Sequence, residues 1–201
     1  MQTVTHFLLT AFVSQQARQR GWLPRRVHLP ALLIGSVLPD LPFTLLTLGF
    51  GLYYWWIGTT PIGESPMIYM HFALFFEDPL WIISHNILHS LVITTLLLGL
   101  GWWGIRRNRR WGLSVCWLAV GTQLHTIIDI GTHHSDGPLL FFPINWSYRF
   151  PAPISYWETA YYGAVVIVIE HVVNVLIMSY FLTRWWQRRR TSRSKHSSNV
   201  N

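Results

Sequence analysis

The sequence has almost no cysteine and very little charge. Its single cysteine among 201 residues is Cys116, which lies inside an apolar run. One cysteine excludes an intrachain disulfide and a cysteine-rich zinc site, so any metal has to be bound by nitrogen and oxygen atoms. The sequence also contains no Gly-x-Ser-x-Gly elbow, no Cys-x-x-Cys pair and no repeat with a period of roughly 20 to 50 residues. Nucleophilic serine chemistry therefore has no support in the sequence.

Charged residues make up 11% of the chain, whereas 51% of the residues are hydrophobic and 12 are tryptophan. Several apolar runs are long enough to cross a hydrocarbon core of about 30 Å, which takes about 20 helical residues. The sequence therefore predicts an all-α, polytopic transmembrane helical bundle with about four to five membrane helices. We expect a single domain over residues 1–184, followed by a basic, disordered cytoplasmic tail over residues 185–201.

Acidic residues are scarcer than basic ones, 8 against 15, which leaves a formal net charge of +7. The basic residues cluster at the ends of apolar runs, over residues 18–26, 106–110 and 184–190. This distribution is typical of cytoplasmic loops, so we predict a multi-pass protein with a cytoplasmic C-terminus. It favours contact with anionic membrane lipids over nucleic acid, which we do not expect as a partner. The loops over residues 58–79 and 131–157, which are poor in basic residues, are predicted on the outer side.

The apolar runs cover residues 29–57, 80–105, 111–130 and 160–182, with a shorter first helix near residues 5–13. The first of the long runs is interrupted by Leu38-Pro-Asp-Leu-Pro42. Two prolines remove backbone donors and should break or kink the helix, which membrane proteins tolerate where the freed groups line a buried cavity. We interpret Asp40 as a metal ligand or a catalytic base at this break. The alternative is that it caps the helix restarting near Phe43.

Histidines and carboxylates recur at helical spacing near the outer ends of two runs. His125 and Asp129 are four residues apart, so on a helix they project from one face. His85 and His89 repeat this spacing and resemble the two helical ligands of zinc hydrolases, although the Glu that follows the first histidine there is Asn86 in this chain. Polar side chains are costly in a membrane and usually have a function. We therefore expect the two stretches to meet and to bind metal.

The outer half offers more candidate ligands than one catalytic zinc requires, which is three protein ligands and a water. One or two ions are therefore predicted, and imidazole and carboxylate donors favour Zn, with Mn or Fe as alternatives, over Mg or Ca. Interhelical hydrogen bonding is the competing interpretation of each residue. Glu170 and His171 are open to use as ligands, as a proton relay or as an interhelical tie, and we favour the tie. The ligand candidates are His6, Asp40, His85, His89, His125, Asp129, His133, His134 and Asp136, with His133 and His134 weighted equally.

These motifs resemble the YdjM-like family of bacterial inner-membrane, metal-dependent hydrolases. The similarity covers most of residues 5–143, and the motifs occur in the family's order. The matching segments are Thr5-His6-Phe7-Leu8, Leu38-Pro39-Asp40, His85-Asn86-Ile87-Leu88-His89-Ser90, the residues His125, Asp129 and Thr132, then Gly137-Pro138-Leu139-Leu140 and Pro143. The resemblance implies a metal-dependent hydrolase in the bacterial inner membrane.

Two departures from the family pattern affect residues beside the expected metal. The Arg and Thr of the family's His-Arg-x-x-Thr-His segment are Asn86 and Leu88 here, and the second acid of its Asp-x-Asp segment is Pro42. The first change removes a cation suited to phosphate or carboxylate, and the second removes a ligand. The family's His-x-x-x-Asp helix is similar to that of zinc-dependent phospholipase C and related nucleases, which implies phosphodiester or phospholipid cleavage.

The leading hypothesis is a hydrolase of a phosphoester or lipid at the outer half of the membrane. In it His85, His89, His125 and Asp129 bind metal, Asp40 binds metal or acts as general base, and His6 and His134 complete the site. The alternative is a non-catalytic subunit of a membrane complex whose histidines bind haem or a pigment, or only pack. Membrane lipids are expected partners under both hypotheses, and complex partners under the second.

Overall fold

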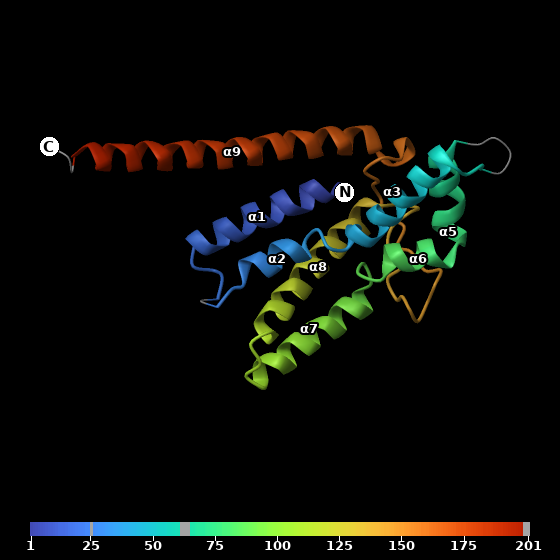
Figure 1. Ribbon diagram of the computed structural model, residues 1–201, viewed down its shortest axis with the longest axis horizontal. Coiled ribbons are helices and arrows are strands. Elements are labelled where there is room, and N and C mark those ends of the chain that lie inside the picture. The colour runs from blue at the N-terminus through green and yellow to red at the C-terminus, as the bar shows by residue number, and fades with distance from the viewer. Residues whose placement is uncertain (25, 61–64, 199–201) are drawn as a thin grey trace.

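The computed structural model describes residues 1–24, 26–60 and 65–198, which form helices joined by turns and one isolated bridge between Leu139 and Arg149. The predicted all-α class is confirmed. Figure 1 shows the elements, which are α1 (Thr3–Gln19), α2 (Leu29–Gly35), α3 (Asp40–Trp56), α4 (Pro66–Ile68), η2 (Tyr69–Leu74), α5 (Phe75–Glu77), α6 (Pro79–Asn86), α7 (Leu91–Arg106), α8 (Gly112–Thr132), η3 (Thr159–Tyr161) and α9 (Gly163–Ser198).

Two helices, α8 and the part of α9 up to Arg190, are long and apolar enough to cross a membrane. Two pairs, α2 with α3 and α6 with α7, reach that length only together and are bent by 47° and 45°. By length and composition the described residues thus contain two to four spans. The four apolar runs of the sequence correspond to these four units, and α1, with 17 residues, is not among them.

The bend between α2 and α3 lies where the two prolines predict it. α2 ends at Gly35, and α3 begins at Asp40, directly after Pro39. A proline ring fixes its own backbone and cannot donate a hydrogen bond, so the helix restarts there in a new direction. The Asp40 side chain turns toward α1, where Oδ2 accepts a hydrogen bond of 2.5 Å from Thr3. Asp40 is the first residue of α3, and no side chain caps this helix, so the alternative role of Asp40 as a helix cap is wrong.

The bend between α6 and α7 was not expected, and the prediction that His85 and His89 share one continuous helix is wrong. α6 ends at Asn86, and His89 lies in the turn before α7. The Ser90 side chain accepts from the backbone N–H groups of Val92 and Ile93, which caps the new helix. The break is thus stabilised by a local cap. Ser90 lies inside an apolar run, so the sequence pattern did not indicate a helix start there.

The long loop after α8 packs over this break. The buried Asn86 amide donates to the Ile82 carbonyl at 2.8 Å and accepts from the Leu139 N–H at 2.6 Å. Ser90 also donates to the Phe142 carbonyl, and Leu139 and Phe142 form a small core with Ile82. The loop after α8 therefore holds the turn that carries His89.

The helix α8 lies between α2 and α7 and packs closely on both (Figure 1). A Cβ on Gly121 would lie 2.3 Å from the Leu32 carbonyl oxygen, and one on Gly35 would lie 2.2 Å from the Leu118 carbonyl oxygen. Only glycine permits such close contact between helix backbones, as is common between membrane helices. The α2–α8 contact brings the end of α2 beside His125.

The last helix lies along α1 (Figure 1) and is joined to it by buried polar contacts. Glu170 accepts from the Gln2 N–H at 2.7 Å and from the Thr5 hydroxyl at 2.6 Å, and Asn174 donates to the same hydroxyl at 2.8 Å. Glu170 is therefore an interhelical tie, as the sequence favoured. His171 is exposed, and its ring bonds to the Ile167 carbonyl of its own helix.

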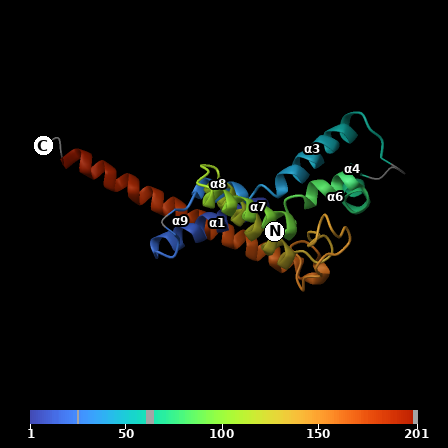
Figure 2. The same ribbon diagram turned by 90° about the horizontal axis from the view of Figure 1, so that it is seen from below.

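The segment after residue 184 is helical as far as the structure describes it, and the domain boundary with its cytoplasmic tail stays a prediction. The helix α9 continues without a break to Ser198, and residues 199–201 lie outside the described residues. Residues 185–198 contain neither proline nor glycine, the two residue types that most disfavour a helix. Figure 2 shows that this end of α9 extends away from the bundle, on the side opposite α3 and α6.

Candidate metal centre

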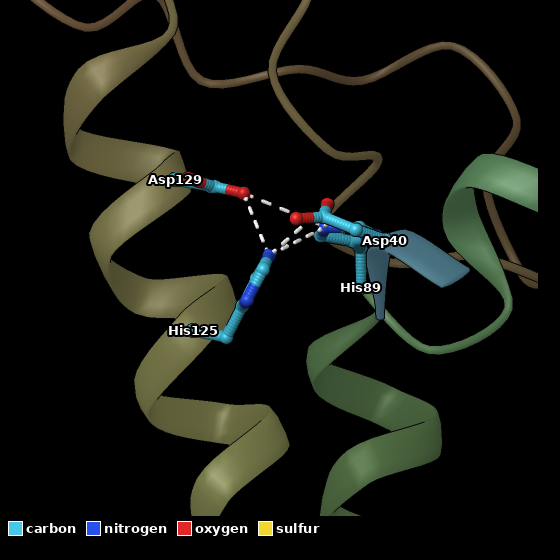
Figure 3. Close-up of side chains that lie close together, drawn as sticks. All are labelled: Asp40, His89, His125 and Asp129. Carbon is cyan, nitrogen blue, oxygen red and sulfur yellow. Dashed lines mark hydrogen bonds and ion pairs between the residues drawn. The ribbon is translucent and has the colours of Figure 1, made fainter. Parts of the chain in front are cut away.

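Four side chains from separate parts of the chain meet in one place (Figure 3). They are Asp40 at the start of α3, His89 in the α6–α7 turn, and His125 and Asp129 on α8. One ligand atom from each lies within 4.8 Å of all the others. The sequence had named all four residues as ligand candidates, and the expected meeting of the two histidine stretches holds for His89 and His125.

The spacing of the ligand atoms suits a small metal ion. The Nε2 atoms of His89 and His125 are 3.0 Å apart, and each lies 3.3 Å from Asp40 Oδ1. Asp129 Oδ2 lies 3.4 Å from His89 Nε2 and 3.0 Å from His125 Nε2. A tetrahedral zinc site with metal–ligand distances of about 2.0–2.1 Å has edges of about 3.3–3.4 Å. The cluster therefore has nearly the dimensions of a four-coordinate site.

The other nitrogen of each histidine defines the direction of its lone pair. His89 Nδ1 lies 2.6 Å from the His85 carbonyl oxygen, and His125 Nδ1 lies 2.8 Å from the Ser36 carbonyl oxygen. A carbonyl only accepts, so each Nδ1 carries a proton, and each ring directs its Nε2 atom into the cluster. Metal-binding histidines are oriented by such outer hydrogen bonds in the same way.

The competing arrangement is a pair of protonated histidines bonded to the two carboxylates. It would place two positively charged rings of His89 and His125 with their nitrogens only 3.0 Å apart. Like charges at that distance disfavour one another. A divalent cation instead neutralises both carboxylates and binds both lone pairs. The donor set thus fits a metal ion better than two protons.

Burial differs among the four residues. His89, His125 and Asp129 are 0%, 1% and 3% exposed, whereas the Asp40 side chain is 21% exposed. Buried charges are stable only when they are paired or bind metal. Asp40 is therefore the most exposed of the four and forms the open side of the cluster.

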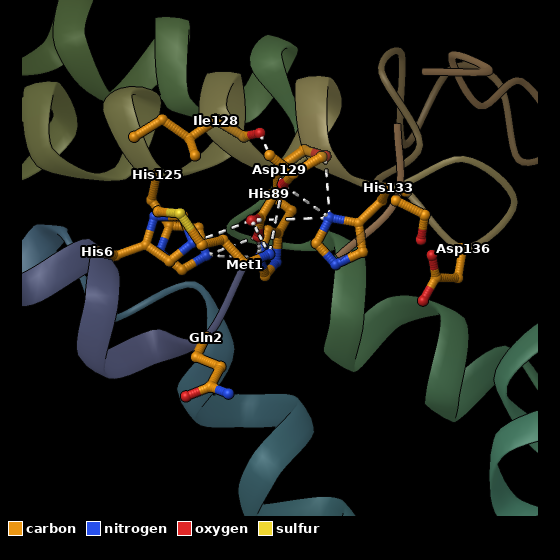
Figure 4. A network of polar contacts seen from close by, with 12 residues as sticks. Met1, Gln2, His6, His89, His125, Ile128, Asp129, His133 and Asp136 are labelled. Carbon is orange, nitrogen blue, oxygen red and sulfur yellow. Dashed lines mark hydrogen bonds and ion pairs between the residues drawn. The ribbon is translucent and has the colours of Figure 1, made fainter. Parts of the chain in front are cut away.

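His6 lies next to the cluster and contacts Asp129 from the other side (Figure 4). Its Nε2 is 2.9 Å from Asp129 Oδ1, and its ring stacks on His125 with 3.7 Å between the centroids. Burial lowers the pKa of His6, against the opposing effect of Asp129. A neutral His6 donates to Asp129 and orients the carboxylate. The Met1 amino nitrogen contacts the same oxygen at 3.0 Å.

The structure separates the two adjacent histidines, and the leading hypothesis that His134 completes the site is wrong. His133 Nδ1 lies 3.0 Å from the Asp129 carbonyl oxygen and 3.7 Å from its Oδ1 (Figure 4), and burial lowers the pKa of His133. His134 instead lies 2.6 Å from the Ala152 carbonyl oxygen and stacks on Tyr161. Between the two histidines, His133 is thus the one beside the cluster, and His134 fastens the loop.

Two other candidates lie outside the four-residue group. The ring of His85 stacks on His89, 4.7 Å between centroids, and neither of its nitrogens has a hydrogen-bond partner among the described residues. His85 contributes through its backbone carbonyl, which holds His89. Asp136 accepts from the indole of Trp157 at 2.9 Å and so belongs to the loop.

Sequence reasoning missed the groups that orient the ligands. The carbonyl oxygens of Ser36 and His85 are backbone atoms that every residue possesses, so no residue type reveals them. Thr3 and Asn86 carry ordinary polar side chains whose partners are far away in sequence. The one sequence feature that could have indicated such a group is Asn86. It replaces an arginine of the family motif, and it binds the loop after α8 through the Leu139 N–H.

A family model described as YdjM inner membrane protein matches residues 1–193 of the chain. No curated protein and no solved structure matches it. The family match covers all four residues of the cluster, together with His6 and His133. The similarity of α8 to the phospholipase C helix therefore stays a prediction.

Proposed function

The chain belongs to the YdjM inner membrane protein family, and on that premise we propose that it is a membrane-bound hydrolase with one divalent metal ion, zinc by its donor set. In this proposal it crosses the membrane several times with its C-terminus in the cytoplasm. The observation that carries the proposal is the convergence of two imidazole lone pairs and two carboxylates at tetrahedral spacing.

The roles of the four residues follow from their burial. His89, His125 and Asp129 are enclosed and hold the ion, which when bound acts as a Lewis acid and lowers the pKa of a water molecule. Asp40 lies at the open side, where its carboxylate orients the attacking water and accepts its proton. His6 keeps the Asp129 carboxylate in place through its 2.9 Å contact.

The surroundings of Asp40 support a substrate that reaches the site from the membrane. The helix that begins at Asp40 exposes a row of leucines at helical spacing, among them Leu41, Leu45, Leu48 and Leu52. Such a face is stable against lipid tails, so an ester within a lipid reaches the open side without leaving the bilayer. A phospholipid or another membrane-accessible phosphoester is accordingly the proposed substrate class.

The geometry argues against one haem held between His89 and His125. Two histidines that ligate one haem approach its iron from opposite faces of the macrocycle. The Nε2 atoms of His89 and His125 are 3.0 Å apart, which leaves no room for a ring between them. A non-catalytic subunit whose histidines pack or bind another cofactor is the competing proposal.

Hydrolysis by the purified full chain separates the two functions. We expect cleavage of a fluorogenic phospholipid or phosphodiester that stops with a chelator and returns with added zinc. Asp40→Asn should lower the turnover at least about a hundredfold, as the loss of a general base does, while metal remains bound. The control is His171→Ala, which changes an exposed histidine outside the cluster. Equal turnover in Asp40→Asn and wild type would contradict the proposed role.

A further inference from the structure

A second site lies at the other end of α1, in a cavity of about 780 Å³ between α1, α2 and α9. Three arginines line it: Arg18 from α1, and Arg184 and Arg188 from α9. The remaining wall is largely apolar and includes Leu29, Leu33 and Phe181. The cavity is thus basic in one part and hydrocarbon-like in another.

The charge of the cavity is of one sign. No Asp or Glu of the described part of the chain lines it. The Nε atom of Arg184 is buried and has no hydrogen-bond partner among the described residues, and its guanidinium lies over the Tyr180 ring. A buried N–H group without a partner costs free energy, so an external acceptor stabilises this arrangement. The complement is an anion.

The depth of the arginines in the membrane follows from their neighbours on α9. Trp185 and Trp186 end the apolar part of this helix, and Arg189 and Arg190 stack over them at 4.0 and 3.6 Å. Tryptophan prefers the level of lipid headgroups. The arginines of the cavity therefore lie at the height of lipid phosphates, with the apolar wall next to the acyl chains.

We propose that this cavity binds one anionic phospholipid. Its phosphate lies among Arg18, Arg184 and Arg188, and one acyl chain lies along the apolar wall. The volume is within the range of about 300–1,000 Å³ that is usual for small-molecule sites. A free phosphate makes no contact with the apolar wall. The cationic headgroup of a zwitterionic lipid would be repelled by the three arginines.

The lipid site is separate from the metal centre. His6, which contacts the metal cluster, and Arg18 lie at opposite ends of α1, about 18 Å apart along its axis. The proposal therefore does not depend on the proposed hydrolase activity. The helix α1 borders both sites.

Native mass spectrometry of the delipidated full chain in detergent tests the proposal. We add phosphatidylglycerol or phosphatidylcholine with the same acyl chains and measure the affinity for the first bound lipid. Phosphatidylglycerol should bind more tightly, and Arg18→Gln/Arg184→Gln should weaken it about tenfold or more. The matched control is Arg109→Gln/Arg110→Gln, which removes the same charge from exposed positions outside the cavity.

A third variant, Ala11→Phe, narrows the cavity and leaves every arginine in place. It should also lose the bound phosphatidylglycerol, which attraction to a basic surface alone does not explain. The proposal is overturned if both lipids bind equally, or if the control pair loses as much affinity as the cavity pair. Displacement of the lipid by an equal concentration of inorganic phosphate would show a free-anion site instead.

Discussion

At the scale of single residues, the candidate metal centre is built around two imidazole nitrogens 3.0 Å apart. The bonds from Nδ1 of His89 and His125 to backbone carbonyls leave both Nε2 lone pairs directed at the same point as two carboxylates. Such a donor set could bind a metal ion. The orientation comes from the backbone, so the choice of ligands is visible in the sequence and their alignment is not.

His6 gives a prediction at this scale because it contacts Asp129 and lies outside the four-residue group. We expect His6→Gln to remain folded and to bind zinc about 10 to 100 times more weakly, since partners that orient ligands typically have effects of that size. Zinc titration against a competing chelator measures the affinity. Unchanged affinity would deny His6 a positioning role, and complete loss would make it a direct ligand, as the sequence suggested.

Among the helices, the two bends show what a sequence reveals and what it conceals. The bend before Asp40 could be predicted because proline excludes a helical hydrogen bond. The bend before His89 could not, because it depends on the contact between Asn86 and Leu139, which are 53 residues apart. The i, i+4 spacing therefore wrongly placed the His85 ring beside His89 as a ligand. The loop after α8, and not a continuous helix, positions His89.

The close packing of α2 on α8 gives a prediction for two glycines that look alike in sequence. Gly121→Ala places a Cβ 2.3 Å from the Leu32 carbonyl oxygen, and this clash forces α2 and α8 apart. We expect a loss of about 1–3 kcal/mol in the free energy of unfolding, the usual cost of overpacking. In Gly99→Ala the new Cβ meets nothing within 4 Å. The unfolding temperature in detergent should therefore stay the same or rise slightly, because alanine favours a helix more than glycine does. Similar losses in both variants would contradict the packing argument.

Taken as a whole, the molecule has a candidate metal centre near one end of α1 and a basic cavity at the other. The sequence predicted the helical class, the apolar runs and every member of the cluster, because residue type and spacing carry that information. It did not predict the cavity, because α1 and α9 are more than 140 residues apart in sequence and only their packing brings Arg18 near Arg184.

The predicted orientation can be tested with single cysteines in a Cys116→Ala background. Asn145→Cys places a thiol in the loop after α8, and Asn108→Cys places one between α7 and α8; both positions are exposed. We expect an impermeant maleimide to label only Asn145→Cys on intact spheroplasts and both after lysis, because the arginines near Asn108 should be cytoplasmic. Labelling of Asn108→Cys alone would reverse the orientation.

Metal content tests the central claim most directly. Elemental mass spectrometry should find about one equivalent of zinc in the chain purified without chelator, as one site held by His89, His125 and Asp129 requires. His89→Ala should lose it, whereas His85→Ala, whose ring nitrogens lie outside the four-residue group, should keep it. No zinc, manganese or iron in the wild type, or equal content in wild type and His89→Ala, would contradict the metal centre.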